Sequence, residues 1–466
     1  MFRTVELPLW ALVLLCLFAA VTLASHFLFP SVRWFFRRRA ERVIARLNTR
    51  LRQPIQPFKL ARRMDTVNRL THDPQVAQAI LDHAESEGIP EEVAFETARR
   101  YAREIVPGFS ATLYFSVATR LARWLSRSLY RVRVTGEVEA LAEVDPTATV
   151  IFVLNHRSNM DYVLVTWLAA RRTALAYAVG EWARRWPLQP LIRAMGGYFV
   201  RRKDLNPLYR KVLARYVQIA TDKGVTQAVF PEGRLSRDGA LQDARLGILS
   251  YVVAGHDGEA ARDVVFVPVA VNYERVLEDR VLIAAETDGP GAFRLRWWMV
   301  ARYLIRHMQL RLTGRFTRFG YAAVAFGRPL SLQRFLWQGH EDATAALGEE
   351  LMARIAAVLP VLPIALVCEA MTEGARDIPT IAVQLDTRAE ALRLQGHPVH
   401  HASRDARDVA LVALRMLAIR DTIKLDGDII HVPEASLPLL RYYARTLPLQ
   451  KSVRSENYRD EEIAIG

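Results

Sequence analysis

The chain has 466 residues, 51% of them apolar, and its 63 lysines and arginines outnumber 49 acidic residues, giving a formal charge of +14. This length is ample to bury a core and excludes a small disulfide-stapled scaffold, while the apolar content excludes a disordered protein. The two cysteines, Cys16 and Cys368, have neither a C-x-x-C nor a metal-ligand spacing, so no zinc site or disulfide framework is predicted. The charge predicts an anionic partner: nucleic acid, a phospholipid surface or a phosphorylated substrate.

The N-terminal segment from Leu7 to Phe29 is a run of 23 residues without a charged side chain. Read as a helix, it spans about 34 Å, which is enough to cross the hydrocarbon core of a bilayer. A cleaved signal peptide has a shorter apolar core of roughly 7–15 residues, and a buried core helix is not expected at the chain end between charged flanks. We therefore interpret residues 1–32 as a membrane anchor.

Arginines follow this apolar run more densely than they precede it, which orients the anchor. Only Arg3 precedes the run, where Glu6 offsets its charge. The arginines that follow are Arg33, Arg37, Arg38, Arg39, Arg42 and Arg46. The positive-inside rule then places the C-terminal side in the cytoplasm, as a single-pass protein whose cysteines need no oxidising compartment.

The pattern after the anchor predicts three regions. Residues 33–130 are basic and mostly helical, and prolines divide them into short pieces. Residues 131–340 alternate helical stretches with apolar runs of strand length at 131–136, 148–156, 174–179, 225–233, 264–272 and 321–327. This alternation predicts an α/β domain with a central, mostly buried β-sheet flanked by helices. Residues 341–466 are again helical, with 385–402 as a looser connection, and the apolar stretch 355–368 is too short and too broken by proline to span a membrane.

A second concentration of positive charge lies between Arg294 and Arg318, where aromatic side chains interleave with arginines. The aromatic residues are Phe293, Trp297, Trp298, Tyr303, Phe316 and Phe319. Three interpretations fit: the headgroup layer of an anionic membrane, a surface that stacks single-stranded nucleic acid, or a solvated basic face with aromatics packed inward. The predicted anchor favours the membrane.

The first cluster of chemistry-bearing residues follows a strand-like run and separates His156 from Asp161 by four residues. Ligands of open α/β sheets bind beyond the carboxyl ends of the strands. With the histidine in a turn and the aspartate in the first turn of a helix, the carboxylate can accept from one ring nitrogen and leave the other as a general base. Since no serine or cysteine nucleophile accompanies the pair, it fits direct transfer to a substrate hydroxyl. The alternative is a histidine beside a helix-capping aspartate without a catalytic role.

Three further segments carry weaker signals when each is taken alone. In the run 196–203, two glycines are followed by three cations, and the run 230–237 places two arginines and a serine on a short loop, a candidate clamp for a phosphate. The run 267–273 is apolar and β-prone, so it is most simply a core strand. The basic runs are equally consistent with solvated surface charge.

Together the four segments resemble the ordered motifs of a known family. N-H-x-x-x-x-D, G-x-F-x-R-R, E-G-x-x-S-R and V-P-V-x-x-x-Y are similar to the four motifs of the glycerolipid acyltransferases, and most closely to those of the bacterial membrane-bound glycerol-3-phosphate acyltransferases. The resemblance is strong from about Val150 to Asn272, weaker towards the C-terminus and absent from the predicted anchor. It implies an α/β acyltransferase of phospholipid biosynthesis in the bacterial inner membrane, with its catalytic domain on the cytoplasmic side.

Carried over position by position, the resemblance implies a role for each matching residue. His156 would be the general base for the acceptor hydroxyl, and Asp161 would orient it. The implied phosphate site comprises Arg201, Arg202, Glu232, Gly233, Arg234, Ser236 and Arg237. Pro268 and Tyr273 would lie on the acyl-donor side. The family implies no metal and no cofactor, and its partners are membrane phospholipids, a phosphorylated acceptor, and acyl-CoA or acyl carrier protein as co-substrate.

One position departs from the family pattern. Leu235 stands where the family usually has arginine, and Arg234 precedes it. Either Arg234 supplies the phosphate contact or the acceptor differs. From the resemblance we predict acylation of the sn-1 hydroxyl of glycerol 3-phosphate, and because of this departure we keep lysophosphatidate as the alternative acceptor. A non-catalytic, membrane-anchored lipid-binding protein is a further alternative, which the retention of His156 and Asp161 disfavours. A nucleic-acid partner is not predicted, since no helix-turn-helix, zinc-finger or RNP signature occurs.

Overall fold

The computed structural model describes residues 54–170, 173–180, 188–201, 205–256, 262–287, 318–400 and 405–448, with residues 8, 48, 49, 51, 184 and 258. The chain divides into two compact units, residues 1–55 and 56–466, and the second holds almost all described residues. Apart from Pro8, the predicted anchor lies outside the described residues, as do Arg202 and most of the stretch from Arg294 to Arg318. None of the helices in the described ranges has the length and apolar character needed to cross a bilayer.

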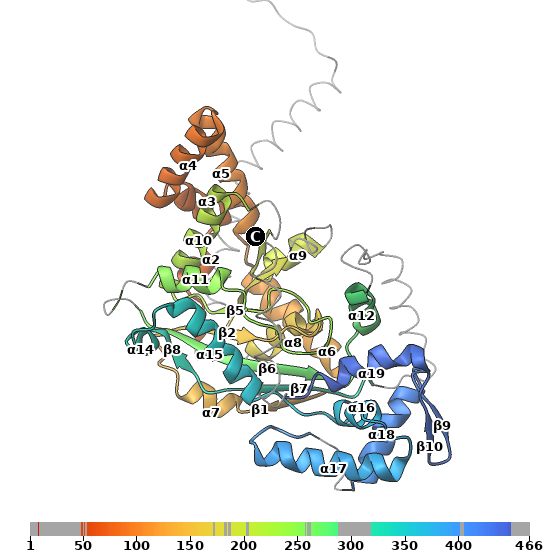
Figure 1. The fold of residues 1–466 in the computed structure, drawn as a ribbon. Helices are drawn as coiled ribbons and strands as arrows, with labels where there is room; N and C mark the ends of the chain where they lie inside the picture. The colour runs from red at the N-terminus through yellow and green to blue at the C-terminus, as the bar shows by residue number, and fades with distance from the viewer. Residues whose placement is uncertain are drawn as a thin grey trace, which may run out of the picture. The chain divides into compact units, whose positions relative to one another are not determined.

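An eight-stranded mixed sheet forms the centre of the second unit (Figure 1). Its strands are β1 (Arg131–Thr135), β2 (Thr149–Leu154), β3 (Ala176–Gly180), β4 (Gly197–Val200), β5 (Gln227–Val229), β6 (Val264–Tyr273), β7 (Tyr321–Phe326) and β8 (Leu330–Ser331). The order across the sheet is β1-β7-β6-β2-β5-β3-β4, and β8 pairs with β6. Strands β6, β2, β5, β3 and β4 are parallel to one another, whereas β7 and β8 run antiparallel to β6. The predicted central sheet with an α/β arrangement is confirmed.

The sequences of β2 and β6 explain why these strands lie in the core. Every residue of both strands is buried, as expected for parallel strands covered on both faces. Alternate side chains of β2 enter different apolar clusters: Phe152 packs with residues of α8, whereas Ile151 and Val153 pack with residues of α10. Two strands differ from the expectation, because β5 is only three residues long and β4 forms from the glycine-containing second motif.

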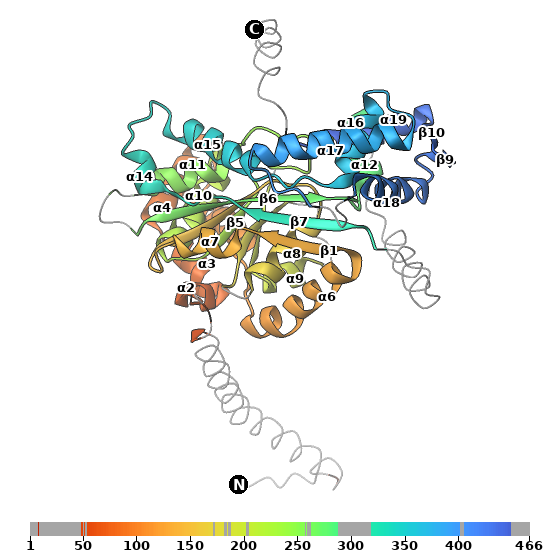
Figure 2. The same ribbon diagram turned by 90° about the horizontal axis from the view of Figure 1, so that it is seen from below.

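Helices cover the sheet on both sides. The helices before β6 are α2 (Pro57–Leu60), α3 (Arg63–Thr71), α4 (Pro74–Glu87), α5 (Glu91–Ile105), a π-helix (Leu113–Ala118), α6 (Thr119–Leu129), α7 (Glu137–Ala142), α8 (Met160–Ala169), α9 (Leu188–Ala194), α10 (Pro207–Asp222) and α11 (Gly247–Ala254). Those after it are α12 (Asp279–Thr287), α14 (Leu332–Leu336), α15 (Ala343–Ala357), α16 (Pro363–Thr372), α17 (Ile378–Leu394), α18 (Ala406–Ala418), a short 3-10 turn (Glu434–Ser436) and α19 (Leu437–Ala444). Figure 2 shows α16 to α19 on the side of β6 and β7 opposite to α6 and α8.

The C-terminal region departs from the prediction in two places. The segment 385–402 was expected to be a loose connection, but α17 continues to Leu394. Its side chains are strong helix formers, and the carboxylate of Asp377 caps the helix by accepting from Thr380 N at 2.8 Å. A small antiparallel hairpin, β9 (Lys424–Asp426) with β10 (Ile429–His431), interrupts a region that was predicted to be entirely helical.

Candidate active site

Three neighbouring parallel strands bring the predicted motif residues to one edge of the sheet. β2 lies between β5 and β6, so the carboxyl ends of these three strands lie side by side. His156 follows β2, Glu232 follows β5, and Tyr273 is the last residue of β6. This edge is the position at which open α/β sheets bind their ligands.

His156 and Asp161 form the buried pair that the spacing predicts. The distance from His156 Nδ1 to Asp161 Oδ2 is 2.9 Å, and the two side chains are 6% and 0% exposed. The same Oδ2 accepts the backbone N–H groups of Arg157 at 2.8 Å and Ser158 at 3.0 Å. Asp161 therefore lies inside the turn that carries the histidine, because it is in the first turn of α8. With Nδ1 donating to Asp161, Nε2 is the ring nitrogen left to accept a proton, and it has no hydrogen-bond partner among the described residues.

Aromatic side chains fix the plane of the histidine ring. The ring of Phe230 lies 4.3 Å from that of His156, centroid to centroid, at an interplanar angle of 32°. Tyr162, one residue after Asp161, contacts the histidine ring edge-on at 5.3 Å. The imidazole is thus held by two aromatic contacts and by a hydrogen bond at Nδ1.

Tyr273 lies on Asp161, a contact that the sequence analysis did not predict. Its hydroxyl donates to Asp161 Oδ1 at 2.7 Å, and the residue is 1% exposed. Burial, followed by the charge of Asp161, raises the pKa of Tyr273 well above its usual value, so the phenol keeps its proton and remains a donor. The resemblance had implied a place on the acyl-donor side for this residue, whereas the structure brings it to the carboxylate behind the histidine. Four donors therefore hold the two oxygens of Asp161.

Glu278 is a second carboxylate of the site that the sequence analysis missed. Its Oε2 accepts the hydroxyl of Ser158 at 2.7 Å, and its Oε1 accepts Asn159 Nδ2 at 3.0 Å and Asn159 N at 3.2 Å. Burial raises the pKa of Glu278 above its usual value, while its hydrogen bonds from Ser158 and Asn159 oppose that rise. The sequence signal that could have identified Glu278 is its position five residues after the tyrosine of the fourth motif, directly before a helix.

Glu232 joins the third motif to the catalytic turn. Its Oε1 accepts the backbone N–H of His156 at 3.1 Å, and Ser236 N donates to His156 O at 3.0 Å. The side chain is 1% exposed, and burial raises the pKa of Glu232 to about 7, against the opposing charge of Arg157. Gly233 makes the turn that follows, because its φ of +66° lies in the left-handed region that favours glycine, and an added Cβ would also displace the side chain of Arg245. Arg157 itself is 1% exposed and donates to Gly239 O.

The predicted phosphate residues of the third motif separate into two groups. Ser236 is fully buried, and its hydroxyl donates to Ala240 O at 2.8 Å, so it holds the loop together instead of facing a ligand. Leu235 packs against the apolar core. Arg237 donates to the carbonyl of Ala285 at 3.3 Å, and Arg234 has no hydrogen bond or ion pair with any described residue. The two arginines are the cations that this loop offers to an anion.

Arg201 lies elsewhere, on the α5 side of β4. Its guanidinium forms a bidentate ion pair with Glu104, with Nε 2.8 Å from Oε1 and Nη2 2.7 Å from Oε2. It also lies over the rings of Tyr101 and Tyr209. Arg184 donates to the same carboxylate at 2.7 Å. The structure thus does not bring Arg201 to His156, and Arg202 is outside the described residues.

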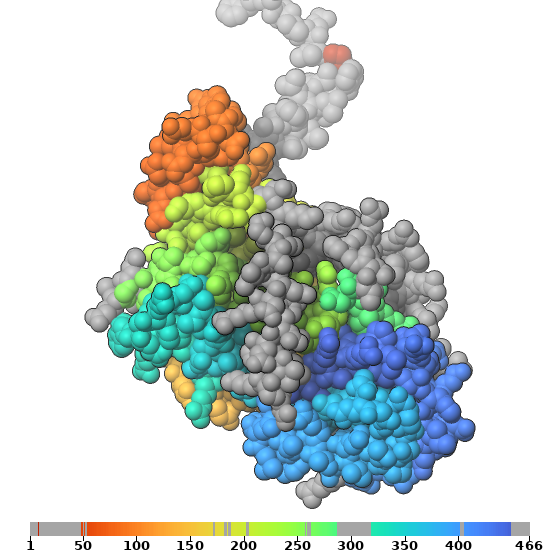
Figure 3. Space-filling view, in the orientation of Figure 1, coloured from red at the N-terminus to blue at the C-terminus, as the bar shows by residue number. Residues whose placement is uncertain are grey.

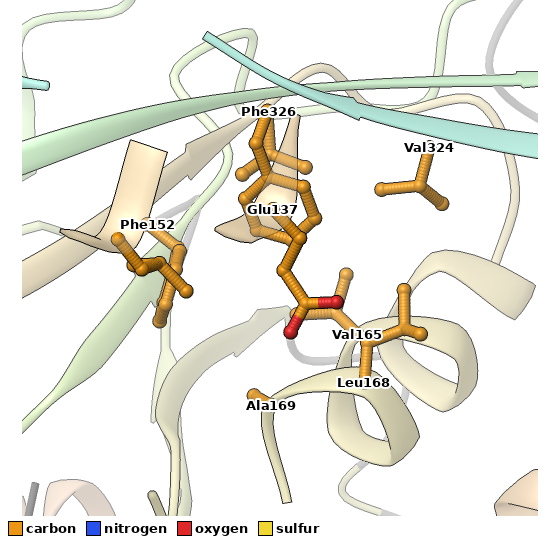
Figure 4. Close-up of a pocket in the computed structure, with 9 residues that line it drawn as sticks. Glu137, Phe152, Val165, Leu168, Ala169, Val324 and Phe326 are labelled. Carbon is orange, nitrogen blue, oxygen red and sulfur yellow. The ribbon is translucent and has the colours of Figure 1, made fainter. Parts of the chain in front are cut away.

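Pro268 lies in the middle of β6, paired with Val153, and its carbonyl accepts Gly327 N at 2.8 Å. It is therefore a core-strand residue away from the carboxyl edge that carries the histidine. A small apolar cavity between the sheet and α8 contains none of the predicted site residues. Figure 4 shows the carboxylate of Glu137 pointing into this cavity from α7, towards Val165 and Leu168.

The described ranges contain no group of three or more histidine, cysteine, aspartate or glutamate side chains placed to hold a metal ion. The geometry of the His156–Asp161 pair suits proton transfer at Nε2 of the histidine. Asn155 ties the start of the turn to β6, since its amide donates to Val271 O at 2.9 Å and accepts Val271 N at 2.7 Å.

Comparison with known proteins matches two regions of the chain. An acyltransferase family model matches residues 131–272, and a model of the glycerol-3-phosphate acyltransferase C-terminal region matches residues 310–444. Together they cover more than half of the chain, and they confirm the resemblance inferred from the motifs.

The curated relatives carry a consistent description. A glycerol-3-phosphate acyltransferase of Pseudomonas fluorescens strain SBW25 is 29% identical over 431 residues, covering 87% of this chain and 50% of that protein. One of Pseudomonas entomophila strain L48 is 29% identical over 431 residues, covering 87% and 51%. The chain therefore spans about half the length of the curated relatives it matches. Among solved structures, the 1-acyl-sn-glycerophosphate acyltransferase PlsC of Thermotoga maritima is 21% identical, with a TM-score of 0.33 over 56% of this chain and 80% of that one.

Proposed function

The chain combines an acyltransferase region with the C-terminal region of the glycerol-3-phosphate acyltransferases, and on this premise we propose that it transfers a fatty acyl group from a thioester to the sn-1 hydroxyl of glycerol 3-phosphate. The observation that carries the proposal is the buried His156–Asp161 pair, whose outer ring nitrogen is left to act as a base. The acyl donor is acyl-CoA or acyl carrier protein. The C-terminal match favours glycerol 3-phosphate over lysophosphatidate as acceptor.

In the proposed reaction, Nε2 of His156 takes the proton of the acceptor hydroxyl as its oxygen attacks the thioester carbonyl. The C–O bond forms, the C–S bond breaks, and the imidazolium returns the proton to the leaving thiolate. Asp161 stabilises the imidazolium, and Tyr273 holds Asp161. Proton transfer by a placed base contributes about 10²–10⁴-fold to such a reaction.

Transfer without an acyl-enzyme intermediate is supported by the hydrogen bonds of Ser158 and Ser236, the serines of the first and third motifs. The hydroxyl of Ser158 donates to Glu278, and that of Ser236 donates to a backbone carbonyl within its own loop. Each hydroxyl proton is therefore committed to an acceptor other than His156. The substrate hydroxyl is the nucleophile that this arrangement leaves for the base to activate.

The acceptor phosphate is assigned to Arg234 and Arg237. Glycerol 3-phosphate is short, so its phosphate must bind close to the base that takes its hydroxyl proton. The loop of the two arginines is tied to the catalytic turn through Ser236 N and His156 O, at 3.0 Å. Arg201, in contrast, follows β4, which lies three strands from β2, about 14 Å at the usual spacing. The planar guanidinium of arginine binds a phosphate through two parallel hydrogen bonds. In this proposal, Arg234 makes the phosphate contact that Leu235, with its apolar side chain, cannot make.

The proposed location is the bacterial inner membrane, with the catalytic unit on the cytoplasmic side. The uncharged run from Leu7 to Phe29 and the arginines after it support this proposal. It is tested by comparing the full chain with a version that lacks residues 1–32. The full chain is expected in the membrane pellet after an alkaline carbonate wash, and its recovery in the supernatant would refute the anchor.

The acceptor is tested with purified protein, labelled palmitoyl-CoA or palmitoyl carrier protein, and either glycerol 3-phosphate or lysophosphatidate. We expect labelled 1-acylglycerol 3-phosphate from the first acceptor. Product from lysophosphatidate alone would assign the chain to the alternative activity. No product from either acceptor with either donor would contradict the proposed function.

A further inference from the structure

The C-terminal helix α19 is connected to the catalytic turn through a chain of buried hydrogen bonds. Tyr443 of α19 is fully buried, and its hydroxyl donates to Asp279 Oδ2 at 2.6 Å. The same hydroxyl accepts the backbone N–H of Val276 at 3.1 Å. Figure 1 shows α19 beside α12, and Figure 3 shows the blue surface of α19 bordering the green of α12. Tyr443 thus fixes two points of the segment 274–279, which links β6 to α12.

Arg420 completes this connection as a buried ion pair. Its guanidinium donates to Asp279 Oδ2 and, at 3.3 Å, to the hydroxyl of Tyr443. The side chains of Arg420 and Asp279 are 9% and 4% exposed. A buried carboxylate is costly unless it is paired and hydrogen-bonded, so Asp279 has a strong preference for this one position. Two residues of the C-terminal region, Tyr443 and Arg420, therefore hold Asp279 and with it the segment 274–279.

The locked segment holds the catalytic turn. Glu278, adjacent to Asp279, accepts from Ser158 Oγ at 2.7 Å and from Asn159 Nδ2 at 3.0 Å. Ser158 N in turn donates to Asp161, the partner of His156. The order of contacts is therefore Tyr443, Asp279 with Val276, Glu278, then the turn 156–161. Each link is a hydrogen bond or an adjacent residue in the chain.

We propose that Tyr443 is a positioning residue for acyl transfer: through the segment 274–279 and Glu278, the C-terminal helix holds the turn that carries His156 and Asp161. The kinetic part of this inference rests on the proposed function, whereas the structural part does not. The C-terminal region thereby has a specific task, because the catalytic turn depends on a hydroxyl group that lies 287 residues after His156 in the sequence, at position 443.

The helix offers a matched control. Tyr442 is the adjacent residue and is 2% exposed, but its hydroxyl has no hydrogen-bond partner in the described part of the chain. Tyr443→Phe removes a donor to Asp279 and an acceptor for Val276 N–H, whereas Tyr442→Phe removes a hydroxyl that makes neither contact. Replacing an unpaired buried hydroxyl with a hydrogen atom is expected to be neutral or stabilising.

The first readout is amide hydrogen exchange, which does not depend on activity. The backbone N–H groups of Arg157, Ser158 and Asn159 donate to Asp161 and Glu278. We expect Tyr443→Phe to speed exchange in a peptide that covers these amides by about tenfold, since local opening of the turn becomes easier. Tyr442→Phe should leave it at the wild-type rate. Equal protection in the two variants would overturn the inference.

The second readout is a double-mutant cycle on kcat with Glu278→Gln. Tyr443→Phe alone should lower kcat about 10- to 100-fold, as expected for a displaced catalytic group, with the KM of the acyl donor within about twofold of wild type. In the Glu278→Gln background, the same substitution should add little, because both act through one path. A purely structural role would instead give independent, multiplying losses, and that result would also overturn the inference.

A variant that fails to fold does not end the test. Asp279→Asn keeps the size of the side chain and weakens the same link, so it should raise exchange in the turn in the same way. An inactive wild-type protein would contradict the proposed function, while the exchange experiment would still decide the inference. An active wild type with an unaffected Tyr443→Phe variant would contradict the inference alone.

Discussion

Replacing Asp161 with asparagine removes a charge from the site without changing the size of the side chain. The amide oxygen can still accept the N–H groups of Arg157 and Ser158, and the NH₂ group can turn towards the hydroxyl oxygen of Tyr273. The fold of the turn should therefore survive. What is lost is the charge that stabilises the imidazolium formed when His156 takes the acceptor proton.

The size of this loss follows from the distance in the structure. At the 2.9 Å between Nδ1 and Oδ2, and with an effective dielectric constant of about 20, two unit charges interact with about 6 kcal/mol. The dipole of the remaining amide recovers part of this energy. Because about 1.4 kcal/mol corresponds to a factor of ten, we expect kcat to fall about 10³- to 10⁴-fold.

The assay is kcat for acyl transfer at saturating donor and glycerol 3-phosphate, with the melting temperature as a control for folding. The Asp161→Asn variant should melt close to wild type and bind its donor with a similar KM. A kcat within about tenfold of wild type, in a folded variant, would refute the view that the charge of Asp161 supports His156 as a base.

Three further predictions follow from the same geometry. Tyr273→Phe leaves one oxygen of Asp161 without its donor, so urea unfolding should show a loss of about 1.5–3 kcal/mol, and an unchanged stability would contradict the contact. Arg237→Lys should raise the KM for glycerol 3-phosphate about tenfold or more while the donor KM stays constant, because an ammonium group cannot form the two parallel hydrogen bonds of a guanidinium. Arg99→Lys, on the surface of α5, is the control. An unchanged acceptor KM in Arg237→Lys would remove Arg237 from the phosphate site. Burial raises the pKa of Glu232 from 4.5 to about 7, so the folded protein keeps a proton that the unfolded chain releases, and wild type loses stability as the pH rises through this window. In unfolding experiments, the stability of Glu232→Gln relative to wild type should therefore grow by on the order of 3 kcal/mol between pH 4.5 and pH 8. A stability difference that does not change with pH would contradict the raised pKa.

The features that could be predicted from the sequence are those that depend on local patterns. The apolar runs of β2 and β6 are buried at every position, and the spacing of His156 and Asp161 is short enough for one turn and one helix start to bring them together. The loop after β5 could be located because a glycine and several charged residues follow an apolar run of strand length, and Gly233 does adopt a left-handed φ in the structure.

The remaining parts of the site depend on contacts between distant segments. Tyr273 meets Asp161 across 112 positions of sequence, and Ser158 meets Glu278 across 120. Nothing in the local pattern of either residue indicates such a partner. The carboxylate of Glu104 lies 97 positions before Arg201, and it explains why this arginine turns away from the predicted phosphate site. Ser236 turns into its own loop because a fully buried hydroxyl needs an acceptor nearby.

The measurement that tests the central claim most directly is acyl transfer by the His156→Ala variant. Purified wild type and variant, both shown to be folded by circular dichroism, are given labelled acyl-CoA and glycerol 3-phosphate. Wild type should form labelled 1-acylglycerol 3-phosphate, and the variant should form it at least about 10²-fold more slowly, since the general base is gone. Undiminished transfer by the variant would contradict a reaction that depends on His156.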